Sequence, residues 1–455
     1  HKCSFLNNFS GENGGAIVFK EISGNYIIDS CEFNSNYGQS DGASIFQYLS
    51  DAVSGTLSIN NSYFLNNFAQ NSNFSIIRAN PQNIIDSTYL FINNCIFKDN
   101  ISDAGDGGAL YYKNFTGFTS LEIRKTIFEN NTSTNDGGAI FIETQTYFKL
   151  AIDQSKFINN KSSNSGWGAI LFQAGYGPKG FVDRNEISIS NTLFARNRDA
   201  IGFNNGDYGA MTIDINNCTF FQNEQYIFSK SYDPTSNYID RFANMYIRNC
   251  VIWEPNATIS TMFYNGDPKK ISDNDFFVYN SSVNIGSLTV GSYNADKGGV
   301  IYYKYPQFKD TTKNDFSLLP CSPLINKGDR KYIDSLGISY DLSGNPRIYQ
   351  DSVDMGAYES QTICTVANTE LDNKTALELI PNLVSSGATV QIQLKESTNI
   401  ENYQLSIYDI GGQLITSITL QNNLTFEAPK EKGFFIVNLL NENRLVGIGK
   451  IVVVE

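Results

Sequence analysis

The chain repeats a short pattern, a phenylalanine followed three residues later by an asparagine, about once every 31 residues. From the second copy on, an isoleucine stands five residues before the phenylalanine and another apolar or aromatic residue stands seven before it. Large residues at every second position are typical of a β-strand with one buried face. A chain with this period is expected to fold as a stack of similar units. The copies are Phe5/Asn8, Phe33/Asn36, Phe64/Asn67, Phe97/Asn100, Phe128/Asn131, Phe157/Asn160, Phe194/Asn197 and Phe220/Asn223, and two more have Ile252 and Val283 at the phenylalanine position.

A glycine pair and a short apolar strand come about ten residues after most of the phenylalanine positions, as at residues 14–17, 107–110 and 137–140. Three short strands per repeat, separated by turns and without an amphipathic helix, are typical of one coil of a parallel β-helix. Each coil would bury three or four apolar side chains, worth on the order of 5 to 10 kcal/mol, whereas ordering its backbone costs roughly 1 to 2 kcal/mol per residue. We therefore predict an all-β fold in which a right-handed parallel β-helix is stable only as a stack of coils.

The chain divides into four predicted parts. The β-helix repeats fill residues 1–305, and because the chain opens at His1 inside a repeat, without a methionine, we expect its N-terminal part to be missing. Residues 306–359 contain prolines and lack the repeat, so we predict a C-terminal cap over the last coil, whose edge and core would otherwise be exposed. A polar linker at 360–376 leads to short alternating runs at 377–455, which predict a small antiparallel β-sandwich.

The charge balance and the histidine content exclude several classes of function. The chain has 33 Lys and Arg against 46 Asp and Glu, a net charge of −13, so nucleic acid and anionic membrane surfaces are poor partners. Its single histidine is His1, which excludes most catalytic triads and most histidine-ligated metals. The sequence contains no run of about 18 apolar residues, so it predicts no transmembrane segment. We therefore expect no cofactor and no metal site.

Five of the seven cysteines share one position of the repeat, two residues before the phenylalanine or before Ile252. Other copies have serine or threonine there, so we predict a small, inward-facing slot with buried thiols instead of a disulfide framework. Cys321 and Cys364 lie outside the pattern and could pair with each other, which the sequence alone does not decide. The five cysteines of the repeat are Cys3, Cys31, Cys95, Cys218 and Cys250.

Two motifs look like ligand sites but have a simpler structural interpretation. Residues 175–180 match a glycine-rich dinucleotide fingerprint, yet a strand and not a helix follows them, so we interpret them as a loop between coils. Asp41, Asp106 and Asp136 each precede a turn glycine and could form a carboxylate column for calcium. Aspartate before glycine more commonly stabilises its own turn. Asn73 interrupts the column, and we expect calcium neither to bind tightly nor to matter for function.

Ligand binding and catalysis have weaker candidates. An enzyme of this fold would need carboxylates clustered with a basic residue, or an acid pair about 5 or 9 Å apart. The nearest such cluster is Arg196, Arg198 and Asp199. Aromatic residues expected to face outward could form a platform for sugars, or could be scattered surface residues of the usual kind. These are Tyr111, Tyr112, Trp167 and Tyr176.

The Phe-x-x-Asn and Gly-Gly-Ala-Ile elements together resemble the repeats of polymorphic outer-membrane proteins and related bacterial surface β-helices. The resemblance covers residues 1–305 and implies the fold and a surface location, but no particular ligand. The segment 316–359 is similar to the closing segment of secreted β-helix proteins of the choice-of-anchor type.

The end of the chain resembles the type A C-terminal sorting domain of type IX secretion in Bacteroidetes. The order of features is a Pro-Asn pair, a Tyr-Asp-Ile-Gly-Gly turn, a Gly-Phe-Phe strand start and a C-terminal Gly-Lys-Ile-Val strand. It departs from the pattern at Leu383, where a second proline is usual, and at Phe434, where a tyrosine often follows the glycine. The resemblance implies an outer-membrane translocon, a shuttle protein that binds the domain and a sortase that removes it. It assigns the sorting signal to Pro381, Asn382, Asp409, Gly412, Gly433 and Lys450.

These observations predict a non-enzymatic β-helix protein that is extracellular, either on the cell surface (the outer membrane) or secreted. We expect it to be exported by type IX secretion and to act as an adhesin or glycan-binding protein. The alternative is a polysaccharide lyase or glycoside hydrolase acting on an extracellular polysaccharide, because parallel β-helices often carry such chemistry. The fold alone does not decide between them.

Overall fold

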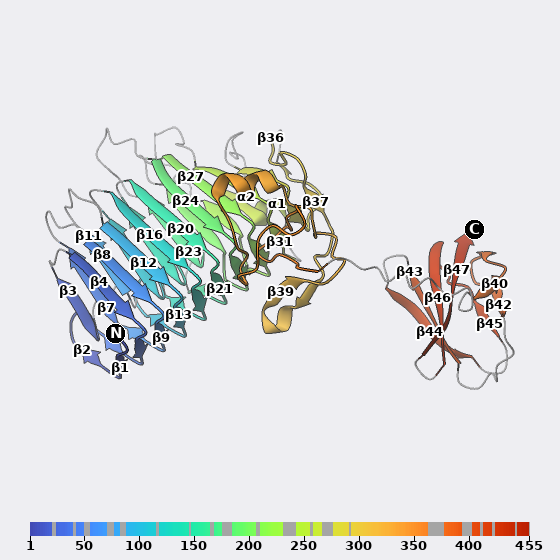
Figure 1. The fold of residues 1–455 in the computed structure, drawn as a ribbon, viewed down its shortest axis with the longest axis horizontal. Coiled ribbons are helices and arrows are strands. Elements are labelled where there is room, and N and C mark those ends of the chain that lie inside the picture. Colours follow the sequence, from blue (N-terminus) through green and yellow to red (C-terminus); the bar gives the residue numbers. More distant parts are fainter. Residues whose placement is uncertain are drawn as a thin grey trace. The chain divides into compact units, whose positions relative to one another are not determined.

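The computed structural model divides the chain into two compact units, His1–Ile363 and Cys364–Glu455, called here the β-helix unit and the C-terminal unit (Figure 1). The fold is all-β as expected, a parallel β-helix followed by mainly antiparallel sheets, and the finer boundaries drawn from the sequence stay predictions. The structure describes residues 1–20, 24–39, 42–49, 55–70, 77–81, 88–114, 118–144, 147–163, 168–174, 184–205, 210–230, 243–254, 258–265, 276–290, 293–362, 377–393, 403–409, 413–420, 424–441 and 444–454.

The described residues of the β-helix unit form four parallel sheets, and successive coils add their strands side by side (Figure 1). Sheet I holds β4 (Gly24–Asp29), β8 (Gly55–Asn60), β12 (Thr88–Asn93), β16 (Thr119–Arg124), β20 (Phe148–Asp153), β24 (Arg184–Ser190), β27 (Ala210–Asn216), β30 (Ala243–Arg248) and β33 (Phe276–Tyr279). Sheet II holds β1 (Ser4–Leu6), β5 (Glu32–Asn34), β9 (Tyr63–Leu65), β13 (Ile96–Lys98), β17 (Ile127–Glu129), β21 (Lys156–Ile158), β25 (Leu193–Ala195), β28 (Thr219–Phe221), β31 (Val251–Trp253), β34 (Ser282–Val283) and β37 (Ile301–Tyr302).

The other two parallel sheets complete the coil. Sheet III holds β2 (Phe9–Ser10), β6 (Tyr37–Gly38), β10 (Phe68–Ala69), β14 (Ile101–Ser102), β18 (Thr132–Ser133) and β22 (Lys161–Ser162). Sheet IV holds β3 (Ile17–Lys20), β7 (Ile45–Leu49), β11 (Ile77–Pro81), β15 (Leu110–Asn114), β19 (Ile140–Thr144), β23 (Ile170–Ala174), β26 (Ile201–Asn205), β29 (Phe228–Lys230) and β32 (Phe263–Asn265). Towards the end of the unit come α1 (Ile259–Met262), the antiparallel pairs β35 (Thr289–Val290) with β36 (Tyr293–Asn294) and β38 (Phe308–Asp310) with β39 (Asp315–Leu318), the 3₁₀ helix η1 (Thr311–Lys313) and α2 (Arg330–Leu336).

Phenylalanine rings form a continuous column inside sheet II. Neighbouring strands pair residues at the same repeat position, so that Phe97 lies between Phe64 and Phe128. Adjacent rings have centroids 4.5 to 5.1 Å apart and planes within 8° of each other. Each such pair contributes roughly 0.5 to 1.5 kcal/mol beyond the burial of its area. The inward register predicted from the repeat is confirmed.

The asparagine of the repeat closes the turn between sheets II and III. Asn131 is typical: its Oδ1 accepts a hydrogen bond from Asn100 Nδ2 at 2.9 Å, and its Nδ2 donates to the carbonyl oxygen of Phe97 at 2.9 Å. Glu254 continues this ladder, because its Oε1 accepts from Asn223 Nδ2 at 2.8 Å. Burial raises the pKa of Glu254 to about 8. At neutral pH the carboxyl group is therefore mostly protonated, and it replaces a neutral amide.

The cysteine slot faces inward, as predicted, and its thiols are free. The hydroxyl of Ser62, which holds the equivalent position in the next coil, accepts a hydrogen bond from the backbone N–H of Cys31 at 3.1 Å. Cys3, in the first described coil, is also free but exposed. Cys321 is disulfide-bonded, and Cys364, which we expected could pair with it, lies outside the described residues. The buried free thiols are those of Cys31, Cys95, Cys218 and Cys250.

Residues 306–362, called here the closing segment, pack along the flank of the β-helix. The outward residues of the sheet II strands from β21 to β31 are mostly apolar, and the closing segment packs over them and removes them from water. Whereas the sequence predicted a cap over the last coil, these contacts extend back along the flank to Ile158. Arg196 joins the contact, since its Nη1 donates to Asn314 Oδ1 at 2.6 Å. The shared core holds Ile158, Leu193, Ala195, Phe221 and Val251 from the β-helix and Phe308, Phe316, Leu318, Leu324, Met355, Ala357 and Tyr358 from the closing segment.

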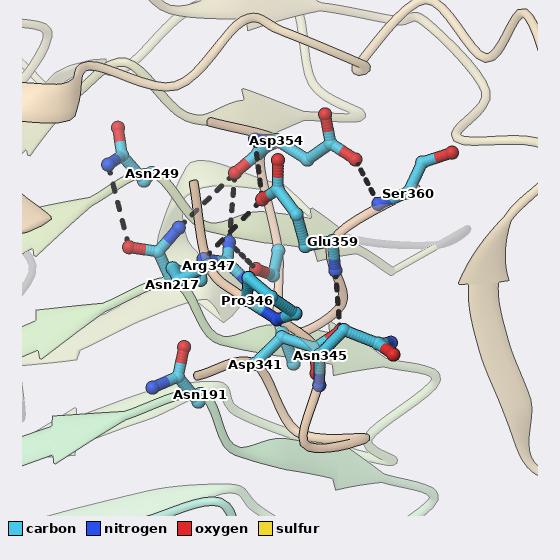
Figure 2. A network of polar contacts seen from close by, with 12 residues as sticks. Asn191, Asn217, Asn249, Asp341, Asn345, Pro346, Arg347, Asp354, Glu359 and Ser360 are labelled. Atoms are coloured by element: carbon cyan, nitrogen blue, oxygen red, sulfur yellow. Dashed lines mark hydrogen bonds and ion pairs between the residues drawn. The ribbon is translucent and has the colours of Figure 1, made fainter. Parts of the chain in front are cut away.

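A buried polar network holds the closing segment against the turns that follow sheet I, as Figure 2 shows. Arg347 is fully buried, and its Nη2 donates to the carbonyl oxygens of Asp354 at 3.0 Å and Gly356 at 2.6 Å. Its Nε lies 3.7 Å from Glu359 Oε2. From the β-helix, Asn217 Nδ2 donates to the carbonyl oxygen of Asp354 at 3.2 Å. Burial raises the pKa of Glu359 to about 8, despite the opposing charge of Arg347.

Candidate functional site

The described residues of the C-terminal unit form two sheets around one apolar core. Successive side chains of a strand point to opposite faces of its sheet, so one face can pack against the core while the other faces outward. On β46, Phe435 and Val437 are buried, whereas Phe434 and Ile436 are exposed. The antiparallel sheets expected here are confirmed, with one parallel pair, β41 with β47. One sheet holds β40 (Glu378–Ile380), β42 (Thr389–Gln393) and β45 (Thr425–Glu427), and the other holds, in spatial order, β41 (Leu383–Ser385), β47 (Arg444–Val454), β46 (Gly433–Asn441), β43 (Tyr403–Asp409) and β44 (Leu414–Leu420).

The structure brings several of the predicted sorting-signal residues to one end of the five-stranded sheet. Strands β43 and β47 end there, β46 begins there, and the short strand β41 runs parallel to the last residues of β47. The carbonyl oxygen of Asn382 accepts from the backbone N–H of Val452 at 2.8 Å, which attaches β41 to β47. Asp409 Oδ1 accepts from the backbone N–H of Gln413 at 2.8 Å and so stabilises the turn after β43. Gly433 is the first residue of β46.

The other sorting-signal residues add no polar pocket within the described part of this end. Pro381 is exposed in the turn that leads into β41, and Lys450 is exposed on β47 opposite Ile436. Gly412 lies outside the described residues. The structure therefore places the described sorting-signal residues in turns and on strands near this end of the sheet.

One face of the five-stranded sheet carries an exposed apolar strip that crosses all five strands. Phe434 is 66% exposed and Leu383 is 59% exposed. Contiguous apolar surface of this kind on a folded domain commonly marks a contact with another molecule. The strip has two rows, Leu383, Val452 and Phe434 across β41, β47 and β46, and Ile436, Tyr408 and Leu414 across β46, β43 and β44.

Two of the four aromatic residues considered for a sugar platform, Tyr111 and Tyr112, are buried and not available for that role. Tyr112 is buried in the core of the β-helix, and Tyr111, on the outer side of sheet IV, is also buried. Tyr111 stacks on Phe141 at 5.2 Å and donates its hydroxyl hydrogen to Glu143 Oε2 at 2.6 Å. The expectation that Tyr112 faces outward was wrong, because its side chain points into the core, whereas Tyr111 faces outward but is covered. Trp167 and Tyr176 lie outside the described residues.

A group of outward aromatic residues on sheet I was missed by the sequence analysis. Tyr89 and Phe91 lie two residues apart on β12, with ring planes 2° apart and centroids separated by 6.2 Å. Phe118, just before β16, contacts Tyr89 at 6.1 Å, and Tyr147, just before β20, lies 5.0 Å from Phe118. We call these four residues the aromatic platform. The signal was present in the sequence, since Tyr89 and Phe91 alternate with the inward positions of the repeat.

The carboxylates considered for calcium have structural contacts in the turns. Asp106 Oδ1 accepts from the backbone N–H of Asp136 at 3.1 Å, and burial raises the pKa of Asp106 to about 6. Asp41 and the glycine-rich residues 175–180 lie outside the described residues. Among the residues that the structure describes, no three His, Cys, Asp or Glu side chains gather in a group suited to a metal ion.

The cluster of Arg196, Arg198 and Asp199 is used for packing. Arg196 contacts the closing segment, and Arg198 Nη1 donates to the carbonyl oxygen of Ser162 at 2.7 Å. Asp199 is buried, its Oδ1 accepts from the backbone N–H of Tyr226 at 3.0 Å, and burial raises its pKa to about 6. The three side chains point to separate partners, so they do not form the acid and base pair that a lyase or hydrolase would need.

Comparison with known proteins identifies the repeat. Residues 2–20 and 125–143 match the Chlamydia polymorphic membrane protein repeat, and each stretch contains one Phe-x-x-Asn element with its Gly-Gly-Ala-Ile strand. No curated protein matches the chain. The match and the fold together identify a β-helix repeat protein of the bacterial surface type, whose repeat family is associated with the outer membrane. No helix among the described residues is long and apolar enough to cross a membrane.

Proposed function

We propose that the protein is an extracellular adhesin, displayed at the cell surface or secreted, whose C-terminal unit directs export by type IX secretion. The β-helix unit would hold the ligand-binding surface, and the C-terminal unit would be recognised by the translocon, bound by the shuttle protein and removed by the sortase. The observation that carries the export proposal is the apolar strip on the five-stranded sheet. It occurs in a separate compact unit and next to the predicted sorting-signal residues.

The strip supports a binding role on energetic grounds. Full burial of a Leu, Ile, Val or Phe side chain is worth roughly 1.5 to 3 kcal/mol. Covering Leu383, Phe434, Leu414 and their neighbours on a partner would therefore contribute on the order of 5 to 10 kcal/mol before the costs of association. Leaving them in water gives the C-terminal unit no stability, so their exposure is better explained by a partner that covers them.

The test is surface display in a bacterium that has type IX secretion. Deleting residues 377–455 should leave the β-helix folded but retained in the periplasm, and grafting 377–455 onto a periplasmic reporter should carry it to the surface. In the full chain, the double substitution Leu383→Ser and Phe434→Ser should reduce display as the deletion does. Gln404→Ser, an exposed polar position on the same face, should leave display unchanged. Unimpaired display of both the deletion and the double variant would overturn the proposal.

A further inference from the structure

We infer that the aromatic platform on sheet I binds a neutral polysaccharide by packing its sugar rings against Tyr89 and Phe91. The inference rests on the proposed adhesin function and names the ligand class and the surface. Its geometric basis is a pair of parallel rings on β12, Tyr89 exposed and Phe91 partly exposed, extended across the next two coils by Phe118 and Tyr147. Tyr89 is 37% exposed even with these neighbours in place.

Three of the four residues beside this ring pair are short and polar, and the fourth is Glu122, which lies beside Phe91 on β16. The strand register puts Thr56 and Ser120 on the two sides of Tyr89, and Ser58 beside Phe91. None of these three neighbours can stack a ring on Tyr89 or Phe91, so the strands at either side leave room for a ligand. The hydroxyl groups of Thr56, Ser58 and Ser120 are hydrogen-bonding groups of the kind that orient sugar hydroxyls in binding sites.

Two other groups of surface aromatics in the described residues differ in this respect. On sheet III the rings of Phe9, Tyr37 and Phe68 stack on one another at 5.1 and 5.7 Å, so Tyr37 has a ring on each face, and Phe9, at the end of the stack, stays 70% exposed. Near the closing segment, the guanidinium of Arg248 lies within 6.0 Å of three ring centroids and so already serves as their partner. Those rings belong to Tyr246, Tyr279 and Tyr332.

The charges around the platform favour an uncharged ligand. Lys149 and Glu186 are paired in register on neighbouring strands, and Arg124 Nε lies 2.5 Å from Glu122 Oε1, so positive and negative groups balance locally. The chain as a whole carries a net charge of −13, which repels polyanions. A pyranose offers an apolar face of C–H groups that complements the negative face of an aromatic ring. A neutral polysaccharide therefore fits better than an acidic one.

The size of the platform suits a chain of sugars more than a single one. Strands in a sheet lie about 4.8 Å apart, so the rings from β12 to β20 span roughly 10 Å along the axis of the β-helix. Sheet I continues with strands on both sides of this span. We expect weak binding at each sugar unit and stronger binding to polymers than to short oligosaccharides.

The experiment is affinity gel electrophoresis of the purified full chain in gels that contain a soluble neutral polysaccharide. Hydroxyethylcellulose, soluble starch, mannan and dextran would be the neutral probes, and polygalacturonate and alginate the acidic ones. The wild-type chain should be retarded by at least one neutral polymer, and the double variant Tyr89→Ser, Phe91→Ser should bind it at least tenfold more weakly. Phe9→Ser removes a more exposed ring, at 70%, from the same β-helix and should bind as the wild type does.

Circular dichroism would show that each variant is folded, and Tyr89→Ser alone replaces the double variant if that one is not. Retardation by acidic polymers only, or equal binding by the wild type and the Tyr89 variants, would overturn the inference, as would no binding to any neutral probe. Because the assay uses purified protein, its result is independent of export. Failure of surface display with intact, Tyr89-dependent binding would overturn the export proposal alone.

Discussion

Replacing Glu254 with glutamine should stabilise the β-helix at alkaline pH and change little at acidic pH. Glu254 is 4% exposed, and burial raises its pKa from an ordinary 4.5 to about 8. A carboxyl group whose pKa is raised by folding contributes stability that is fully present below pH 4.5 and is lost as the pH rises through 8. The difference between these two pKa values corresponds to about 5 kcal/mol in the free energy of unfolding, of which about 3 kcal/mol is already lost at pH 7. Glutamine keeps the oxygen that accepts from Asn223 and does not ionise.

The assay is urea denaturation at about pH 5 and about pH 8.5, followed by circular dichroism and by the fluorescence of the two tryptophans, of which Trp253 directly precedes the substitution. We expect Glu254→Gln to raise the free energy of unfolding by about 2 to 4 kcal/mol at the higher pH and by less than about 1 kcal/mol at the lower. Glu129→Gln is the control, because Glu129 is part-exposed, 3.3 Å from Lys98, and such pairs contribute little. An effect of Glu254→Gln that is equal at the two pH values would refute the reasoning.

Other substitutions test the rest of the β-helix by the same denaturation assay. Asn131→Ala should lower the free energy of unfolding by about 2 to 4 kcal/mol, since it removes buried hydrogen bonds to Asn100 and Phe97. Asn130→Gly, at the neighbouring left-handed position, should lower it by less than about 1 kcal/mol. Similar losses for the two variants would mean that the asparagine ladder is unimportant. Ile123→Asp should cost several kcal/mol and Glu122→Asp little, because only Ile123 faces the core, and equal effects would contradict the register. Arg347→Met should lower the free energy of unfolding by about 3 to 5 kcal/mol and make residues 306–362 sensitive to limited proteolysis. An unchanged digestion pattern would show that the network of Figure 2 does not hold the closing segment.

The stacked part of the fold could be predicted because the same residue type recurs at the same inward position in successive coils. Phe97, Asn100 and Cys95 each meet their equivalents in the neighbouring coils, so the spacing alone specifies their contacts. The closing segment has no such period. Its contact with the flank depends on single long-range pairs, such as Asn217 with Asp354, that no local pattern encodes. The sequence therefore predicted that a different structure begins after the repeats, but not which surface it covers.

Surface sites were harder to predict than the core, for two physical reasons. Whether an outward side chain is exposed depends on what covers its sheet, as at Tyr111, which is outward on sheet IV and yet buried. Whether an aromatic residue offers its ring face depends on its neighbours across the strands, which is a property of the three-dimensional register. Tyr89 lies between Thr56 and Ser120, whereas Tyr37 lies between two other rings. The different neighbours of Tyr89 and Tyr37 follow from the strand register once it is known, but not from residue type alone.

The outward positions explain how one regular scaffold accommodates separate roles. The inward phenylalanine and asparagine positions determine the stacking of the coils, so the outward positions of each strand are free to differ from coil to coil. On sheet II the coils from β21 onward use these positions to bind the closing segment, and Lys98 and Glu129 take polar positions in the coils before it. On sheet I the coils around β12 carry the aromatic platform. A substitution at Tyr89 should therefore change ligand binding without changing the fold, and a substitution at Phe97 should do the opposite.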